Sequence, residues 1–190
     1  YQTAWLKAHH PAAFMAAVLS SDMDNTDKVV TLLEEVRRMD IELLPPSVNQ
    51  SQYSFTIIDD KTICYGLGAI KGVGESAIEL LVNERSENGP YLDLFDLCKR
   101  VDLRKANRRV LDALIRSGSM DSLGAGRSTL AHNLAKAISM AEQHSQNSTS
   151  GQDDMFGLEI SDQYSDETSN DSTMYEIVTD WEDKERLTGE

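Results

Sequence analysis

The sequence predicts a mainly α-helical protein with one small β-hairpin and an acidic, disordered C-terminal linker. Apolar residues recur at helical spacing in several separate segments, which is typical of amphipathic helices packed on a core. Alternation of apolar and polar residues is confined to residues 53–67, where it indicates two short strands around Asp59 and Asp60. Beyond residue 143 the chain is polar, acidic and poor in core-forming residues, so we expect no folded structure there.

Helices are expected before the strands. Residues 1–20 have helical composition, and Pro11 opens a second segment because its missing N–H is harmless in a first turn. Asn25 or Thr26 can cap the next helix, and a double proline at residues 45 and 46 ends the region. The apolar face of that helix is formed by Val29, Val30, Leu33, Val36 and Met39.

Four further helices are expected after the strands. The first follows a glycine-rich run as "ESAIELLVN" (75–83), with a loop at 86–90. Asp93 can cap "LFDLCKRV", and the amphipathic "KANRRVLDALIRS" is followed by Gly118, a residue type that commonly ends helices. "RSTLAHNLAKAISMAEQH" is the last expected helix.

Composition narrows the class of protein. The chain has 190 residues and begins with Tyr1, so we interpret it as part of a longer polypeptide. We find no signal peptide and no apolar run near the ~18 residues of a membrane span, and therefore expect a cytoplasmic protein without a membrane partner. Cys64 and Cys98 stand apart from each other and from metal-spaced histidines, so we expect two reduced, buried thiols and no metal site.

The net charge of −14 is unevenly distributed. Residues 143–190 contain 13 acidic and 2 basic residues, whereas residues 1–142 contain 19 and 16, a net charge of only −3. Within "KRVDLRKANRR" (99–109) six residues are basic and one is acidic. The average charge therefore describes the linker, and the folded part carries a local basic patch.

Four glycines lie together in "GLGAIKGVGESAI" (66–78), a pattern that lets backbone approach a phosphate. A Walker loop is excluded because Lys71 precedes Gly72 and no Ser or Thr follows at the required position. A dinucleotide fingerprint is nominally present as Gly72, Gly74 and Ala77. It lacks its context, since a strand should run directly into Gly72.

The run also fits a helix-hairpin-helix, in which a short helix at 67–71 turns through Gly72-Val73-Gly74 into a helix beginning at Glu75. Both hairpin glycines permit positive φ, and the unpaired amides of Gly74, Glu75 and Ser76 would hold one backbone phosphate without reading bases. Lys71 would add charge, whereas Glu75 would point sideways and serve the helix dipole. On spacing alone, a tight helix–helix corner in which the glycines only permit packing is an equally good interpretation.

A second, degenerate helix-hairpin-helix is expected in "NRRVLDALIRSGSMDSLG", with Ser117 and Gly118 at the hairpin. The basic residues that would flank a duplex backbone are Arg100, Arg104, Lys105, Arg108 and Arg109. A charge run is more often a solvated helix face, but two hairpins beside one patch favour a DNA-binding role. The expected fold class is thus a tandem helix-hairpin-helix module with a small β-hairpin and an acidic linker.

Several segments together resemble the bacterial DNA polymerase III alpha subunits, the C family of replicative polymerases. They are "YQTAWLKAHHPAAFMAAVLSSDMDNTDKVV", "LPPSVNQSQYSF", "YGLGAIKGVGESAIE" and "NRRVLDALIRSGSMDSLG", in the order that the family has, with "GQDDMFG" extending the match. The resemblance implies fingers-domain helices at 1–47 and a duplex-holding β-hairpin and tandem hairpin module at 48–142. It further implies a flexible linker at 143–180 and, at 181–190, the lead-in to an OB-fold.

The resemblance also implies partners. The peptide Gln152-Asp153-Asp154-Met155-Phe156 would dock in the sliding clamp (the beta subunit), and the parent would assemble with the polymerase III core and holoenzyme. The family's catalytic aspartates and their Mg²⁺ lie in a palm domain to which nothing here corresponds. We therefore expect a non-catalytic, cofactor-free segment of a DNA-directed DNA polymerase. Two alternatives remain open: the tandem hairpins of a repair nuclease or ligase, and a cofactor-binding enzyme using the dinucleotide fingerprint.

Overall fold

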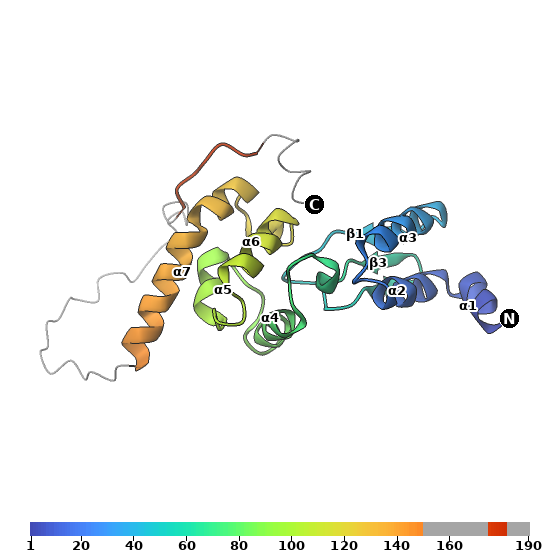
Figure 1. The fold of residues 1–190 in the computed structure, drawn as a ribbon, viewed down its shortest axis with the longest axis horizontal. Coiled ribbons are helices and arrows are strands. Elements are labelled where there is room, and N and C mark those ends of the chain that lie inside the picture. The colour runs from blue at the N-terminus through green and yellow to red at the C-terminus, as the bar shows by residue number, and fades with distance from the viewer. Residues whose placement is uncertain (150–174, 182–190) are drawn as a thin grey trace, which may run out of the picture.

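The computed structural model describes residues 1–149 and 175–181. Three helices form its N-terminal end (Figure 1): α1 (Gln2–His9), α2 (Pro11–Ser21) and α3 (Thr26–Arg38). Pro11 occupies the first turn of α2, and the Asn25 side chain caps α3 by accepting a hydrogen bond from the Lys28 N–H at 3.2 Å. Both features match the sequence prediction.

A three-stranded sheet of order β1-β3-β2 packs against α2 and α3. The expected hairpin is formed by antiparallel β2 (Thr56–Asp59) and β3 (Thr62–Cys64). A third strand, β1 (Glu42–Leu44), pairs in parallel with β3 and was not expected, because three residues are too few to show a pattern. Phe55 and Ile63 of the hairpin share one hydrophobic cluster with α2 and α3, so the hairpin packs on the helices expected to belong to the preceding domain.

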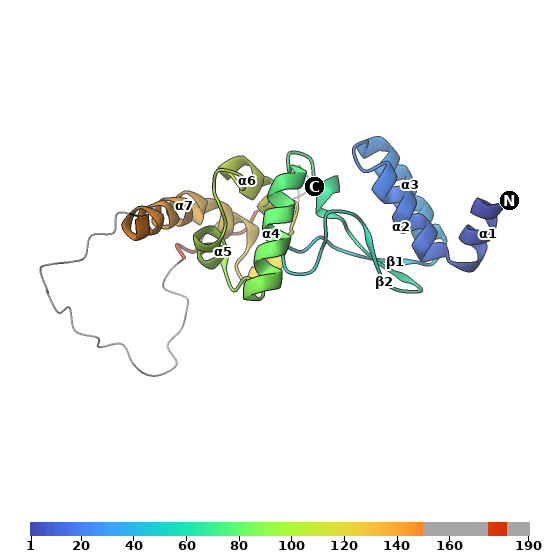
Figure 2. The ribbon, with the colours of Figure 1, turned by 90° about the horizontal axis from the view of Figure 1, so that it is seen from below.

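The other end of the molecule is helical (Figure 2). A 3₁₀ turn, η1 (Leu67–Ala69), precedes α4 (Glu75–Asn88) and α5 (Leu94–Arg100), and α6 (Arg108–Arg116) is followed by the 3₁₀ turn η2 (Asp121–Leu123) and by α7 (Arg127–Thr149). Three boundaries differ from expectation. The helix expected at 67–71 is only η1, α4 runs into the loop expected at 86–90, and α7 continues past residue 143.

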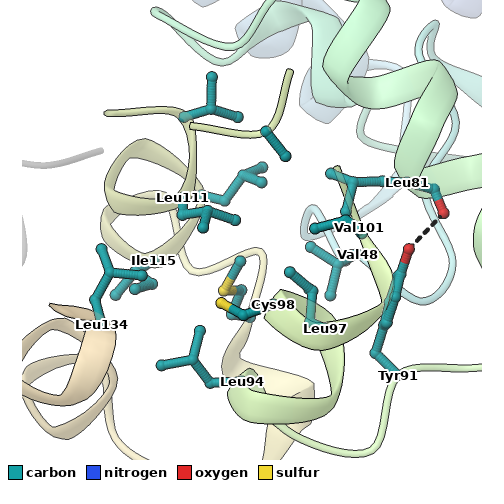
Figure 3. Packing of buried hydrophobic residues seen from close by; sticks show 14 of the residues in the cluster. Val48, Leu81, Tyr91, Leu94, Leu97, Cys98, Val101, Leu111, Ile115 and Leu134 are labelled. Atoms are coloured by element: carbon teal, nitrogen blue, oxygen red, sulfur yellow. Dashed lines mark hydrogen bonds between the residues drawn. The ribbon is translucent and has the colours of Figure 1, made fainter. Parts of the chain in front are cut away.

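Figure 3 shows the larger hydrophobic cluster, where α4 to α7 meet. The Tyr91 hydroxyl donates to the Leu81 carbonyl at 2.9 Å within this core. Cys98 lies in the core, and burial, together with the charge of Asp93, raises the pKa of its thiol to about 12. Cys64 is buried as well, so both thiols lie inside the protein as expected.

The backbone of the turn at residues 47–51 is hydrogen-bonded to two separate parts of the helical end of the molecule. The Val48 N–H donates to the Ser119 carbonyl at 2.8 Å, beside the second hairpin. Arg85 of α4 donates to the carbonyls of Val48 and Ser51, each at 2.6 Å. This turn therefore fixes α4, which begins at the first hairpin, relative to the second hairpin.

Two described parts of the expected linker have defined contacts. Residues 143–149 continue α7, and residues 175–181 lie along α7 (Figure 1). The structure therefore differs there from the disorder that composition suggested, because α7 supplies polar side chains that hold the returning segment. None of the described helices is both long and apolar enough to cross a membrane.

We predict that Arg85→Met destabilises the protein by about 2–4 kcal/mol, because two carbonyls lose a charged donor while the aliphatic packing remains. Urea unfolding followed by circular dichroism measures the change. Arg38→Met is the matched control, since Arg38 only approaches Glu34 on the surface at 3.8 Å and should cost less than ~1 kcal/mol. Equal effects of the two substitutions would contradict the joining role of Arg85.

Candidate nucleic-acid interface

A cleft of about 1030 Å³ lies between the sheet end of the molecule and α6. One side is formed by the segment from Leu43 to Ser47, and the other by α6 and the turn after it. The cleft brings together five residues that the sequence singled out: Lys71, Gly72, Arg109, Ser117 and Gly118. The two hairpins, 46 residues apart at their glycines, therefore open on one hollow.

The first hairpin has the expected turn but only one left-handed glycine. Gly72 has φ +92, a conformation that favours glycine, whereas Gly74 is the extended N-cap of α4 with φ −81. Gly74 does not use the positive φ that glycine permits, because one left-handed residue is enough to reverse the chain. Val73 between them is buried in the core, and its N–H donates to the Ile70 carbonyl at 3.2 Å. Val73 thus anchors the hairpin and does not face a ligand.

Three amides at the start of α4 remain available. Among the described residues, the N–H groups of Gly74, Glu75 and Ser76 have no acceptor, and no side chain caps the helix. The first such bond into α4 is from Ala77 to the Gly74 carbonyl at 3.1 Å. Because Glu75 and Ser76 are exposed, the positive end of α4 is open to solvent.

The four positions of the run differ in whether and why they require glycine. A Cβ on Gly66 would lie within 2.6–2.8 Å of the Tyr53–Phe55 backbone, and one on Gly68 would collide with Tyr53. These two permit packing, and Gly72 permits the turn. A Cβ on Gly74 would meet no atom within 4 Å, and its φ suits any residue. Nothing inside the described protein requires glycine at position 74, so the packing-corner interpretation does not explain it.

The second hairpin has the expected shape but is closed internally. Gly118 has φ +79, and a Cβ there would overlap the guanidinium of Arg127. Arg127 itself binds the Asp121 carboxylate at 2.9 Å. The amides of Gly118 and Ser119 donate to carbonyls within α6 at 3.0 and 3.1 Å. The Ser117 hydroxyl donates to the Leu114 carbonyl. This hairpin therefore offers side chains, not free amides, to a ligand.

The basic stretch divides into exposed and internally bound residues. Arg108 and Arg109 at the start of α6, like Lys71, are exposed and form no ion pair within the described chain. Lys105 is exposed near Asp102, and Arg104 pairs with Asp102 at 3.0 Å.

Arg100 is internal. Its guanidinium binds Glu84 and Asp96, each at 3.1 Å, and stacks on Tyr91 with only 16% of its side chain exposed. Burial lowers the pKa of Arg100, but the hydrogen bonds that it donates to the two carboxylates, together with their negative charges, outweigh burial and raise the pKa overall. Arg100 therefore holds α5 against α4, and its expected contact with a duplex does not fit its position.

The dinucleotide-binding alternative does not fit the fold. The strand before the hairpin, β3, ends at Cys64, eight residues before Gly72, and a 3₁₀ turn intervenes. Ala77, the third fingerprint position, is buried in the core.

Within residues 1–149 and 175–181, no three His, Cys, Asp or Glu side chains are placed to hold a metal ion.

The helix-hairpin-helix motif family matches residues 40–130, which include both hairpins. DNA polymerase III subunit alpha of Escherichia coli K12 is 52% identical over 158 residues, which cover 83% of this chain and 14% of that protein. The Vibrio cholerae and Pseudomonas aeruginosa subunits are 45% and 46% identical, each covering the whole chain and 16% and 17% of the relative. The chain is homologous to one segment of the DNA polymerase III alpha subunit family. The expected resemblance is confirmed, and the chain spans about one sixth of those relatives.

Sequence reasoning missed three residues of this region. Arg116 and Arg127 line the cleft, and Arg85 supports it from α4. A signal existed for Arg116, which lies two helical turns after Arg109 on the same face of the same amphipathic helix. The peptide Gln152–Phe156, expected to bind the clamp, lies outside the described residues.

The two hairpin glycines should respond oppositely to substitution. Gly74→Ser should leave stability unchanged or raise it by up to ~1 kcal/mol, because serine is a good N-cap and its Cβ has room. Gly118→Ala should cost about 1–3 kcal/mol, through left-handed strain and displacement of Arg127. Thermal unfolding of both variants checks this, and a larger loss for Gly74→Ser would restore the packing-corner interpretation.

Proposed function

We propose that this segment binds the backbone of double-stranded DNA without reading its sequence, at the first hairpin and the basic residues around the cleft. The observation that carries the proposal is Gly74, which lacks a Cβ where the protein has room for one, beside three amides that have no acceptor among the described residues. Glycine at such a position lets a ligand's phosphate reach the backbone.

The chemistry fits a phosphodiester. Amides at a helix start bind an anion through short-range hydrogen bonds, and Lys71 adds a charge that acts over a longer distance. Arg108 and Arg109, which form no ion pair with any residue that the structure describes, supply two further cations at the start of α6. None of these groups is held in a geometry that selects base edges, so the binding energy comes from the backbone alone. Glu75 lowers the affinity locally, since its carboxylate stands in the same turn.

The role follows from the family. In a longer alpha subunit, sequence-independent backbone contacts would keep the enzyme on its template during DNA-directed synthesis in the bacterial cytoplasm. The catalytic chemistry would then belong to other parts of that polypeptide, and this segment would contribute residence time.

Duplex binding should be weak and steeply salt-dependent. We expect a dissociation constant of roughly 10⁻⁴–10⁻⁶ M, typical of non-specific contacts, and no preference among duplex sequences. Arg108→Ala with Arg109→Ala should reduce the slope of log K against log salt by up to about two, since each lost phosphate contact removes about 0.9. Gly74→Val should weaken binding by placing a branched side chain before the amides.

Fluorescence anisotropy with a labelled duplex measures all of these effects. The matched control is Arg37→Ala with Arg38→Ala, an adjacent exposed pair on α3 that does not line the cleft. Normal binding by a folded Gly74→Val variant, or equal salt slopes for the two arginine pairs, would remove the basis for the interface.

A second binding function is favoured by the peptide Gln152–Phe156. Met155 and Phe156 can fill adjoining apolar pockets, Met by adapting its shape and Phe by its area, while the Gln152 amide both donates and accepts at a pocket rim. The order of residues is similar to the QxxLF-type clamp peptides of the family, with Met155 in place of leucine. We infer that this peptide tethers the polymerase to the sliding clamp and thereby raises its effective concentration on DNA.

Clamp binding should depend on the apolar pair. A single linear peptide loses chain entropy on docking, so we expect a dissociation constant of about 10⁻⁶ M or weaker. Met155→Ala with Phe156→Ala should abolish binding to immobilised clamp while leaving duplex affinity intact, and Gln152→Ala should weaken it less. Surface plasmon resonance gives the affinities. Ile160→Ala, just outside the peptide, serves as the control, and unchanged clamp affinity in the double variant would refute the assignment.

A further inference from the structure

Residues 175–181, which we call the strap, lie extended beside the first part of α7 (Figure 1), and the first residue of the strap, Tyr175, contacts α5. The Tyr175 ring packs edge-on against Phe95 at 5.2 Å between centroids, and its hydroxyl accepts from the Leu94 N–H at 2.9 Å. These contacts fix one end of the strap at the start of α5.

Two side chains of α7 each bind both the N–H and the carbonyl of one strap residue. The Asn133 side chain donates to the Glu176 carbonyl at 2.9 Å and accepts from the Glu176 N–H at 3.0 Å. One helical turn earlier, the Thr129 hydroxyl makes the same pair of contacts with Val178, each at 3.3 Å. Side chains four residues apart on α7 therefore bind strap residues that are two apart, because one helical turn and two extended residues span similar lengths. The strap covers Asn133, of which only 1% is exposed.

The other end of the strap reaches the second hairpin. The Asp180 carboxylate accepts from the Ser128 hydroxyl at 3.2 Å in the first turn of α7. Gly126 leaves room for it, since a Cβ there would lie 3.4 Å from the carboxyl carbon. The Trp181 ring covers the Arg116 guanidinium at 5.3 Å; Arg116 lines the cleft and also binds the Asp112 carboxylate one turn earlier on α6 at 2.8 Å. An anion therefore occupies the positive end of α7, and an aromatic ring covers a cation that faces the cleft.

The start of α7 and Arg116 are the groups near the second hairpin that could bind a phosphate, because the amides of the hairpin itself already have internal acceptors. We propose that the strap is an autoinhibitory segment: Asp180 and Trp181 hold the start of α7 and Arg116 in the free protein, and a bound duplex backbone displaces them. This inference rests on the proposed duplex binding and adds its regulation. Strap docking then sets the affinity of the second hairpin for DNA.

The test uses the whole chain and a short labelled duplex of mixed sequence at low salt. Asn133→Ala loosens the strap without changing charge or the cleft, and Asp180→Asn removes the carboxylate from α7. The controls are Gln143→Ala, an exposed residue later on α7, and Asp60→Asn, an exposed acid between β2 and β3 with the same change in charge. We expect both strap variants to bind the duplex roughly three- to tenfold more tightly, as a shifted closed–open equilibrium requires, and both controls to match the unsubstituted protein.

Hydrogen exchange supplies a second readout. Saturating duplex should speed exchange of the Glu176 and Val178 amides in the unsubstituted protein, because their Asn133 and Thr129 acceptors are released. Two results together would overturn the strap proposal: strap variants that bind like the controls, and unchanged exchange at both amides. They overturn the strap proposal alone if Arg108→Ala with Arg109→Ala still weakens binding. No binding by any variant, strap-loosened ones included, overturns the proposed duplex binding and the strap proposal with it.

Discussion

The cleft depends on how one buried residue, Val48, is held by its backbone. Its N–H donates to Ser119 at the second hairpin, and its carbonyl accepts from Arg85 on the helix that begins at the first hairpin. Its side chain is fully buried in the larger core. The N–H of Val48 is bound at the second hairpin and its carbonyl is bound by the helix of the first hairpin. Neither hairpin can therefore move relative to the other without breaking one of these two hydrogen bonds. The spacing between the hairpins is therefore set by backbone geometry and not by the surface charges that line the cleft.

Each hairpin turns through one left-handed glycine, but the two hairpins differ in their chemistry. At the first, the glycine before α4 is free of neighbours and the amides lack acceptors, so an anion can approach the backbone itself. At the second, Arg127 lies over Gly118 and the amides are satisfied within α6, so only side chains face outward. The first hairpin can supply a short-range contact to one phosphate, and the second can supply charge. A duplex bound as proposed would be hydrogen-bonded at one point and attracted at others, an arrangement that would permit sliding.

Local chemistry made much of the fold predictable from sequence. Asn25 and Asp93 cap their helices as expected, and Gly118 ends α6, because these features depend only on neighbouring residues. Strand β1 was missed because its pairing with β3 is parallel and long-range. Arg100 was misjudged for a similar reason: a run of basic residues does not reveal which of them faces an acidic partner such as Glu84 across a helix interface. The sign of φ at Gly74 likewise could not be read from the sequence, since glycine adopts negative and positive φ about equally readily.

The overall charge of −14 does not decide whether this segment meets a polyanion. Charges in water act over a Debye length of about 10 Å at 0.1 M salt, so acids farther away are largely screened from the cleft. What matters there is which anion contacts the cations and the helix starts. The described acids that do so at the second hairpin are Asp112, bound to Arg116, Asp121, bound to Arg127, and Asp180, at the start of α7. Asp121 lies three residues from Gly118 and belongs to the turn itself, whereas Asp180 arrives from 52 residues beyond Ser128 and is held by contacts that can be exchanged. Under the strap proposal, an acidic protein would keep a DNA-binding surface because one of its own carboxylates, that of Asp180, occupies this surface reversibly.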